Sequence, residues 1–269
     1  MSNLPLFGES VRTESCGMNL AASSMTSVTG GSRAWGSYVE LSASTSFEYG
    51  GFTIFTHTQA VNHNMLRIAI GAAASEVVIA DLIPATNNNT RRQQNSIYLP
   101  VRVPAGARIA VAAAVDNATT SAFNVGLIGH GLGPRAPQGF SRAYGYGVAI
   151  TSGNFMKTLT ASATPHAKGS YTQLDAATAY PMKAFMPVTI ADGANSGYAL
   201  TDFAIGAAAS EVIIYPDMPS YGYSSTQDSI ANYAGVIPCN IPAGVRIAAR
   251  CQSDVVSYAQ NRVALIGLD

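Results

Sequence analysis

Apolar and polar residues alternate with a period of two along several short segments of this chain. At residues 108–115, Ile109, Val111 and Val115 fall on one face and Arg108 on the other, and residues 245–252 repeat the pattern. This period is typical of a β-strand with one buried face. Further short strands are expected at residues 47–57, 76–79, 125–128 and 211–214. Polar turns separate the strands and no amphipathic helix is evident, so we predict an all-β fold, an antiparallel sandwich of jelly-roll type.

Four blocks of sequence occur twice, in the same order. AIGAAASEVVI at residues 69–79 returns as AIGAAASEVII at residues 204–214. The other blocks are GSY at 36–38 and 169–171, VPAGARIA at 103–110 and IPAGVRIA at 241–248, and VGLIG at 125–129 and VALIG at 263–267. The offsets are 133 (169 − 36), 135 (206 − 71), 138 (244 − 106) and 138 (267 − 129). Such long and nearly constant offsets predict a duplicated domain rather than a solenoid of short repeats.

The duplication defines the expected domain organisation. We predict two tandem β-sandwich domains, at residues 17–130 and 147–269, each large enough to enclose a core of its own. Residues 131–146 contain prolines and glycines and are interpreted as a linker. Residues 1–16 remain as an N-terminal arm.

Composition and charge exclude several classes of function. The 269 residues include 15 basic and 15 acidic side chains, so the chain lacks the basic excess of a protein that binds nucleic acid. No apolar stretch is long enough to span a membrane, and the N-terminus does not resemble a signal peptide. Three scattered cysteines indicate neither a disulfide framework nor a zinc site. We therefore expect a protein that is made and kept in a cytoplasm, or released by a route other than secretion.

No motif for catalysis is evident. His57, His63, His130 and His166 do not recur at matched places in the two copies, and their spacing fits no metal site. The chain has no GxSxG elbow and no phosphate-binding loop. We expect no enzymatic activity and no cofactor or metal, although a carboxylate pair for glycoside cleavage assembles in space and stays open.

Two charged residues occur at matched positions in both copies. Glu76 and Arg108 correspond to Glu211 and Arg246. One interpretation is a paired functional site. The other, which we favour, is structural: the carboxylate accepts backbone N–H groups at the start of a strand, and the arginine bridges to a neighbouring strand.

Tyrosines in polar loops are the candidate contact residues. Tyr221, Tyr223 and Asp228 lie in one long polar segment, and Tyr144 and Tyr146 lie in a similar stretch of the linker. Tyrosine binds protein surfaces at a low entropic cost, and it also stacks on sugars. We expect contacts with neighbouring subunits, with glycan binding as the alternative.

The repeated blocks resemble a family of tailed-bacteriophage structural proteins whose members carry patterns like TKGSW, IGAAGSE and YIPAGSRIAAR. The matching segments here are KGSY at 168–171, IGAAASE at 205–211, IPAGVRIAAR at 241–250 and VALIG at 263–267. The first copy departs from the pattern at Trp35, where lysine is usual, and at Ala112, where arginine is usual. The resemblance covers both copies and implies a component of the virion, without catalytic residues.

The sequence thus leads to the hypothesis of a non-enzymatic protein on the particle exterior, as a capsid decoration or a fibre or tail appendage, assembled in the host bacterial cytoplasm. Other virion proteins would be its partners, with Leu4, Leu6 and Phe7 of the arm entering a groove on a neighbour. The duplication favours a homo-oligomer, with a trimer presenting six similar units. The alternative is a receptor- or glycan-binding adhesin of the tail, and a glycan-cleaving depolymerase is a third, weaker possibility.

Overall fold

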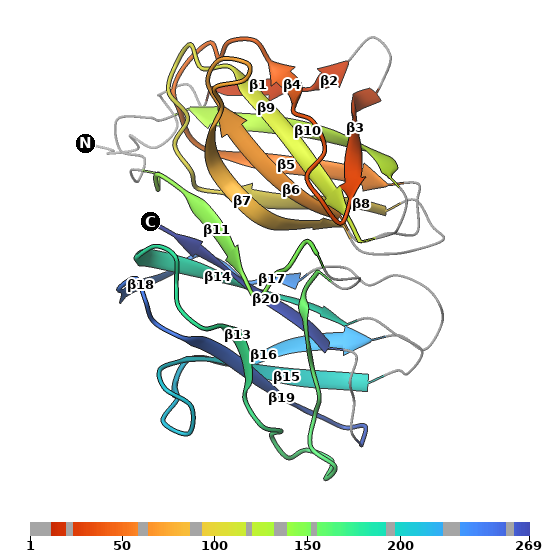
Figure 1. Cartoon of the computed structure of the whole chain (residues 1–269), viewed down its shortest axis with the longest axis vertical. Coiled ribbons are helices and arrows are strands. Elements are labelled where there is room, and N and C mark those ends of the chain that lie inside the picture. Colours follow the sequence, from red (N-terminus) through yellow and green to blue (C-terminus); the bar gives the residue numbers. More distant parts are fainter. Residues whose placement is uncertain are drawn as a thin grey trace, which may run out of the picture.

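The computed structural model is all-β. Within the described residues it contains twenty strands and no helix, and therefore no helix that could cross a membrane. The described residues are 12–19, 24–58, 64–86, 93–116, 120–131, 139–151, 155–191, 197–222, 232–256 and 261–269. In Figure 1 the N-terminal half of the chain forms the upper body and the C-terminal half forms the lower body.

Ten strands belong to the first half of the chain. They are β1 (Thr13–Cys16), β2 (Met18–Asn19), β3 (Ser24–Ser32), β4 (Val39–Ser42), β5 (Tyr49–Thr58), β6 (Asn64–Ile70), β7 (Val77–Thr86), β8 (Gln93–Leu99), β9 (Ile109–Val115) and β10 (Ser121–Gly131). The expected half-buried strand at residues 108–115 is β9, but all seven of its residues are buried. The prediction was wrong about the second face because its alanines are small enough to pack rather than to face water.

Ten further strands belong to the second half. They are β11 (Ala143–Tyr146), β12 (Lys157–Leu159), β13 (Thr172–Asp175), β14 (Met182–Ala191), β15 (Gly197–Ile205), β16 (Val212–Gly222), β17 (Asn232–Tyr233), β18 (Ile237–Ile241), β19 (Ile247–Ser253) and β20 (Asn261–Leu268). The expected strand at residues 211–214 is the beginning of β16.

Corresponding strands pair in the same way in the two halves. In the first half β9 lies between β4 and β6, and β6 pairs with β7; in the second half β19 lies between β13 and β15, and β15 pairs with β16. Likewise β10 pairs with β5, and β20 pairs with β14. The registers agree with the sequence offsets: Phe55 lies opposite Gly126, and Val188 lies opposite Ala264.

Strand β11 connects the two halves. It pairs in antiparallel fashion with β20 and in parallel fashion with β7, so a sheet of sixteen strands runs through both halves, beside a separate sheet formed by β13, β19, β15 and β16. Residues 143–146, predicted as part of a linker, are therefore a central strand. Strand β1, predicted as the end of a free arm, pairs with β10.

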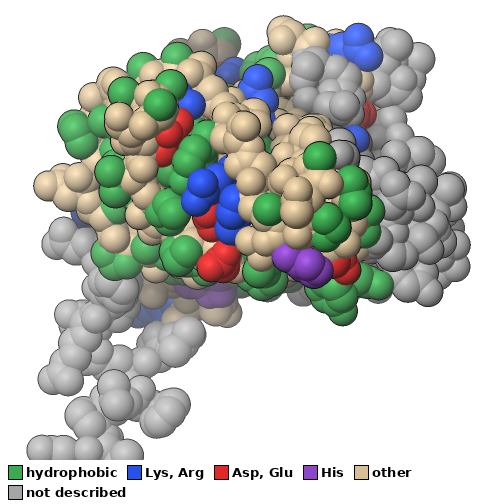
Figure 2. Space-filling view, turned by 90° about the horizontal axis from the view of Figure 1, so that it is seen from below, with side chains coloured by type: hydrophobic (Ala, Val, Ile, Leu, Met, Phe, Trp, Pro, Cys, Tyr) green, Lys and Arg blue, Asp and Glu red, His purple; other side chains and the backbone are tan. Residues whose placement is uncertain are grey.

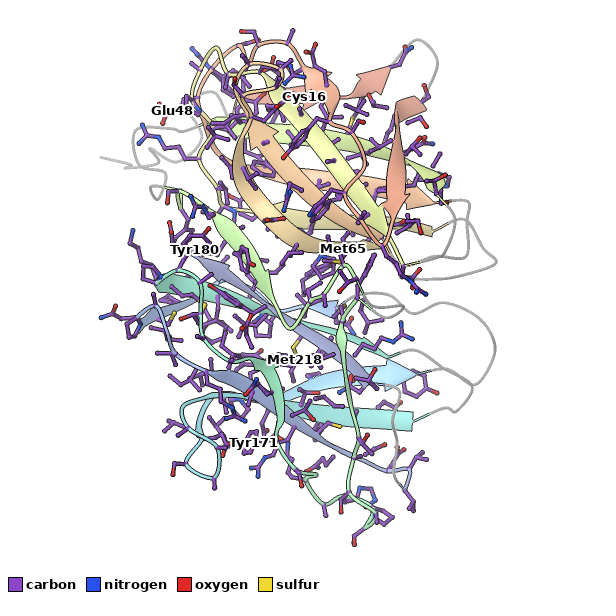
Figure 3. The ribbon with its side chains drawn as sticks, viewed as in Figure 1. Cys16, Glu48, Met65, Tyr171, Tyr180 and Met218 are labelled. Atoms are coloured by element: carbon purple, nitrogen blue, oxygen red, sulfur yellow. The ribbon has the colours of Figure 1, made fainter. Side chains whose placement is uncertain are left out.

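The two halves also share a hydrophobic core. One face of β14 and β20, including Met186, Val188 and Ile266, packs into the core of the first half. The opposite face, including Phe185 and Leu265, packs into the core of the second half. At the border, Met65 of β6 packs against Phe155 of the second half. Figure 3 shows Met65 on the side of the first half that faces the second half. Strands β14 and β20 thus form a layer that is buried on both sides.

Candidate functional site

The repeated glutamate and arginine form an ion pair in each half. Arg108 Nη1 lies 3.2 Å from Glu76 Oε1, and Arg246 Nη1 lies 3.0 Å from Glu211 Oε1. Burial raises the pKa of Glu211, but hydrogen bonds from backbone amides and from the guanidinium outweigh burial and leave that pKa below its usual value. Each carboxylate is therefore paired with the matching arginine, and that of Glu211 is held in its charged form.

The same arginines hold the repeated turn. Arg108 donates a hydrogen bond to the carbonyl oxygen of Gly71, and Arg246 donates one to the carbonyl oxygen of Gly206. Both glycines have a φ of 107°, which side-chain-bearing residues rarely adopt. The phrase AIGAAASEV thus forms a turn between two strands, and in each half the arginine that immediately precedes the adjacent strand, β9 or β19, holds this turn.

A second set of charges lies on the outer face of the smaller sheet. Asp202 of β15 is 3% exposed at its side chain and accepts hydrogen bonds from Lys168 Nζ at 2.7 Å and from Arg250 Nε at 3.0 Å. Lys168 also contacts the exposed Asp217, and Arg250 stacks on the ring of Tyr171. Figure 2 shows that uncharged side chains cover most of the face seen from below, with charged side chains gathered in a few places.

The matching place in the first half uses the opposite arrangement of charge. Arg67 stands where the second half has the aspartate; it binds Asp81 at 2.8 Å and stacks over Trp35, with its guanidinium carbon 4.3 Å from the ring centre. A lysine at position 35 or an arginine at position 112 would repel Arg67. This accounts for Trp35 and Ala112, which stand where the second half has Lys168 and Arg250.

The candidate contact site is an exposed group of tyrosines at one edge of the second half. Tyr198 of β15 and Tyr221 of β16 lie directly opposite each other, with ring centres 4.5 Å apart, and are 62% and 47% exposed. Together with Tyr215 and Pro219 they border a hollow of about 410 Å³ that opens between β16 and β17. We call these four residues the tyrosine surface. Strand alternation produces it, because Ala199, the residue after Tyr198, points inward and is buried.

The other tyrosines proposed from the sequence are placed differently. Tyr146 is 1% exposed, and burial raises its pKa to about 12. Tyr144 is half-buried and packs against Tyr146 and Tyr180, so both predicted contact tyrosines of β11 serve to pack this strand on the second half. The remaining candidates, Tyr223, Asp228, Leu4, Leu6 and Phe7, lie outside the described residues.

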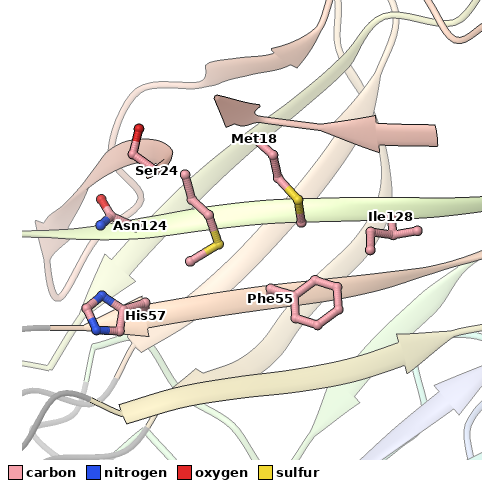
Figure 4. A pocket seen from close by; sticks show the side chains of 7 residues that line it. Met18, Ser24, Phe55, His57, Asn124 and Ile128 are labelled. Atoms are coloured by element: carbon pink, nitrogen blue, oxygen red, sulfur yellow. The ribbon is translucent and has the colours of Figure 1, made fainter. Parts of the chain in front are cut away.

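A second hollow, of about 550 Å³, lies on the outer face of β5 and β10 in the first half. Met18 and Met25 border it from β2 and β3, and Phe55, His57 and Ile128 line it from the two longer strands, as Figure 4 shows. We call this set the methionine hollow. Gly126 of β10 leaves room for the side chain of Met18, since a Cβ atom there would lie 2.9 Å from the methyl carbon of Met18.

The described residues contain no group of three or more histidine, cysteine or acidic side chains that could hold a metal ion. His57 lines the methionine hollow, His130 is hydrogen-bonded to Thr53 at 2.8 Å, and His63 lies outside the described residues. Burial raises the pKa of Cys251 to about 11, which keeps this thiol protonated and unreactive at neutral pH.

Sequence interpretation found Tyr221 and missed Tyr198, Tyr215 and the methionine hollow. Tyr198 begins the alternating segment GYALTDF, so its outward position could have been found from the period of two. Its proximity to Tyr221 could not, because that depends on the register between β15 and β16.

No protein-family model matches the sequence, and no curated protein matches it. Among solved structures, similarity extends to PNGF-II, with a TM-score of 0.38 and 8% identity over 95% of this chain, which spans only 65% of that one. It also extends to the CBM22-1–CBM22-2 tandem domain of Paenibacillus barcinonensis Xyn10C, with a TM-score of 0.29 and 10% identity over 96% of this chain and 91% of that one. The T13 particle of IBDV gives a TM-score of 0.29 and 10% identity over 96% of this chain and 69% of that one. At these TM-scores the similarities carry no conclusion about family or function.

Proposed function

We propose that this protein is a non-enzymatic structural component on the exterior of a bacteriophage particle. In this proposal two tandem β-sandwich units form the body, and the protein assembles through contacts with neighbouring subunits, as a capsid decoration or a fibre or tail appendage. It is made in the bacterial cytoplasm and ends in the virion, as a homo-oligomer for which a trimer is the expected form. The resemblance of the repeated blocks to phage structural proteins supports the particle, and the tyrosine surface supports the contacts.

The observation that carries the contact role is the exposed pair of Tyr198 and Tyr221. Large aromatic side chains on a surface are enriched where proteins bind one another, because they bury much area while losing little conformational entropy. This pair lies beside a shallow hollow and next to Pro219, so an apolar group of a partner would contact several of these side chains at once.

Removing both rings tests the contact role. In phage carrying Tyr198→Ser and Tyr221→Ser, we expect the protein in purified particles to fall at least tenfold, measured by quantitative mass spectrometry against the major capsid protein. The matched control is Val77→Ser, which removes a side chain that is 60% exposed at the start of β7. Normal incorporation of the double variant would reject the tyrosine surface as the contact.

A deletion tests whether the N-terminal arm tethers the protein to the particle, and the structure determines where the deletion should end. Because β1 pairs with β10 and Glu14 accepts a hydrogen bond from Tyr49, removal should stop at residue 11. We expect the shortened protein to melt at the wild-type temperature but to be absent from particles. Incorporation at the wild-type level would show that Leu4, Leu6 and Phe7 do not tether the protein.

The second candidate function is glycan binding by a tail adhesin. It is favoured by the tilted arrangement of Tyr198 and Tyr221, which offers ring faces to a sugar, and by Asn232 at the rim of the hollow, whose amide can bond sugar hydroxyls. On an array of bacterial surface glycans, this function requires signals from the wild type that the double tyrosine variant loses. If the wild type gave no signal on the array, glycan binding would be rejected and the subunit-contact role would remain.

A further inference from the structure

The first half is covered along its β7 side by the second half. The hydroxyl of Tyr233 donates a hydrogen bond to the carbonyl oxygen of Pro84 at 2.7 Å, and Pro84 is buried. Ile190, with Phe155 and Met156, lies against Pro84 and its neighbours, so the side chains along this edge of the first half are shielded from water by the half that follows it in the chain.

Among the described residues, the matching side of the second half is more exposed to solvent. Pro219 occupies in β16 the place of Pro84 in β7, since each lies opposite the matching residue of the neighbouring strand, but Pro219 is exposed. Tyr215 similarly replaces the fully buried Ala80, and Ile213, which is 42% exposed, replaces the half-buried Val78. Two of the four residues of the tyrosine surface, Tyr215 and Pro219, are therefore the counterparts of residues that the first half buries.

The face of β14 and β20 that packs on the first half also has a more exposed counterpart in the first half. In the second half, Val188 and Ile266 on the outer face of β14 and β20 are fully buried against the first half. The matching residues of β5 and β10 are Phe55 and Ile128, which are partly exposed and line the methionine hollow. Among the described residues, the face of the first half that bears Phe55 and Ile128 packs on no second layer, and the side of the second half that bears Pro219 and Tyr215 has no layer packed on it.

The edges of the sheet match in the same way. Strand β1 has the place in the first half that β11 has in the second, because each precedes a glycine with positive φ and pairs with the corresponding strand, β10 or β20. The second edge of β11 pairs with β7, whereas β1 pairs only with β10 among the described strands. Thr13 and Ser15 of β1 are accordingly exposed, while Ala143 and Gly145 of β11 are buried.

We propose that a second copy of this chain binds head to tail, its methionine hollow seated on the tyrosine surface of the first copy, so that the packing between the halves is repeated between molecules. The inference deepens the proposed function and rests on it in taking the partner to be this chain rather than a glycan. A contact between two different surfaces leads to a closed ring or to an open chain of subunits. We expect this contact between molecules to be less tightly packed than the contact between the two halves. Ser15 of β1 occupies the position of Gly145, whose missing side chain lets β11 lie close to Leu82 of β7.

A complementation experiment tests the direction of the contact. Tyr221→Lys disables the tyrosine surface, and Phe55→Lys disables the methionine hollow. Ile128→Lys replaces Phe55→Lys if the Phe55 variant does not give the wild-type circular dichroism spectrum. Sedimentation velocity from 1 to 100 µM should show association of the wild type and at least a tenfold weaker association of each variant alone. An equimolar mixture of the two variants should form a species of two chains and no larger one, because each variant retains one intact surface.

Three results would overturn the inference. The first is a wild-type protein that stays monomeric at 100 µM. The second is a Phe55→Lys variant that associates as strongly as the wild type, which would indicate a symmetric contact between two tyrosine surfaces. The third is a mixture that gives no two-chain species. The particle role is tested separately, by labelling purified particles with an antibody against the protein. Labelled particles together with a monomeric protein would reject only the head-to-tail contact. Self-association together with unlabelled particles would reject only the particle role.

Discussion

Replacing Gly145 by alanine is expected to lower the free energy of unfolding by about 3 kcal/mol, the upper range for a side chain added to a packed interior. A Cβ atom at this position would lie 2.0 Å from the carbonyl oxygen of Leu82, a backbone atom that cannot turn away. Strand β11 would have to move from β7, and the pairing of Tyr144 with Asp81 would be lost with it. Urea unfolding followed by circular dichroism measures the change.

Gly235 provides the matched control. A Cβ added there would meet no atom within 4 Å, and its backbone φ does not require glycine, so alanine should change stability by less than about 0.5 kcal/mol. If Gly145→Ala unfolds at the same urea concentration as Gly235→Ala, the close contact between β11 and β7 is not what joins the two halves.

Replacing Asp202 by alanine should lower the free energy of unfolding by about 3 kcal/mol at pH 7, because removing one partner of a buried charge cluster leaves the others uncompensated. Its carboxylate accepts bonds from Lys168, from Arg250 and from the backbone amide of Asp217. Asp217→Asn is the control: the residue is exposed, asparagine tolerates its φ of 50°, and the lost surface ion pair contributes less than about 1 kcal/mol.

The stabilisation that Asp202 contributes should be lost at low pH. Burial raises the pKa of this carboxyl, but the hydrogen bonds from Lys168, from the amide and from Arg250 outweigh it and leave the pKa lowered. A lowered pKa in the folded state stabilises the protein above the unfolded value of about 3.9 and ceases to do so as the pH falls through the folded value. The difference between wild type and Asp202→Ala should thus be constant from pH 7 to 5 and narrow below about pH 4. A difference that grows as the pH falls would contradict this assignment.

Six of the strands, β5, β7, β9, β10, β16 and β19, and the correspondence between the two halves could be predicted from the sequence, because alternation and repeated blocks are local features. The shared core was not predicted, although it has a signal in the sequence. Residues 263–268, VALIGL, are apolar on both faces, whereas the matching residues 125–130 are VGLIGH, ending in His130. A strand without a polar face is expected to be buried on both sides. The tyrosine surface needed the register between β15 and β16, which no local pattern supplies.

Because both faces of β14 and β20 are buried, neither half of the chain can be removed without exposing apolar side chains of the other. A protein shortened to its C-terminal half would expose Met186, Val188 and Ile266 to water, and a large exposed apolar patch promotes aggregation. The N-terminal portion alone would lose the cover over Pro84. Each half therefore depends on the other to keep its apolar face out of water.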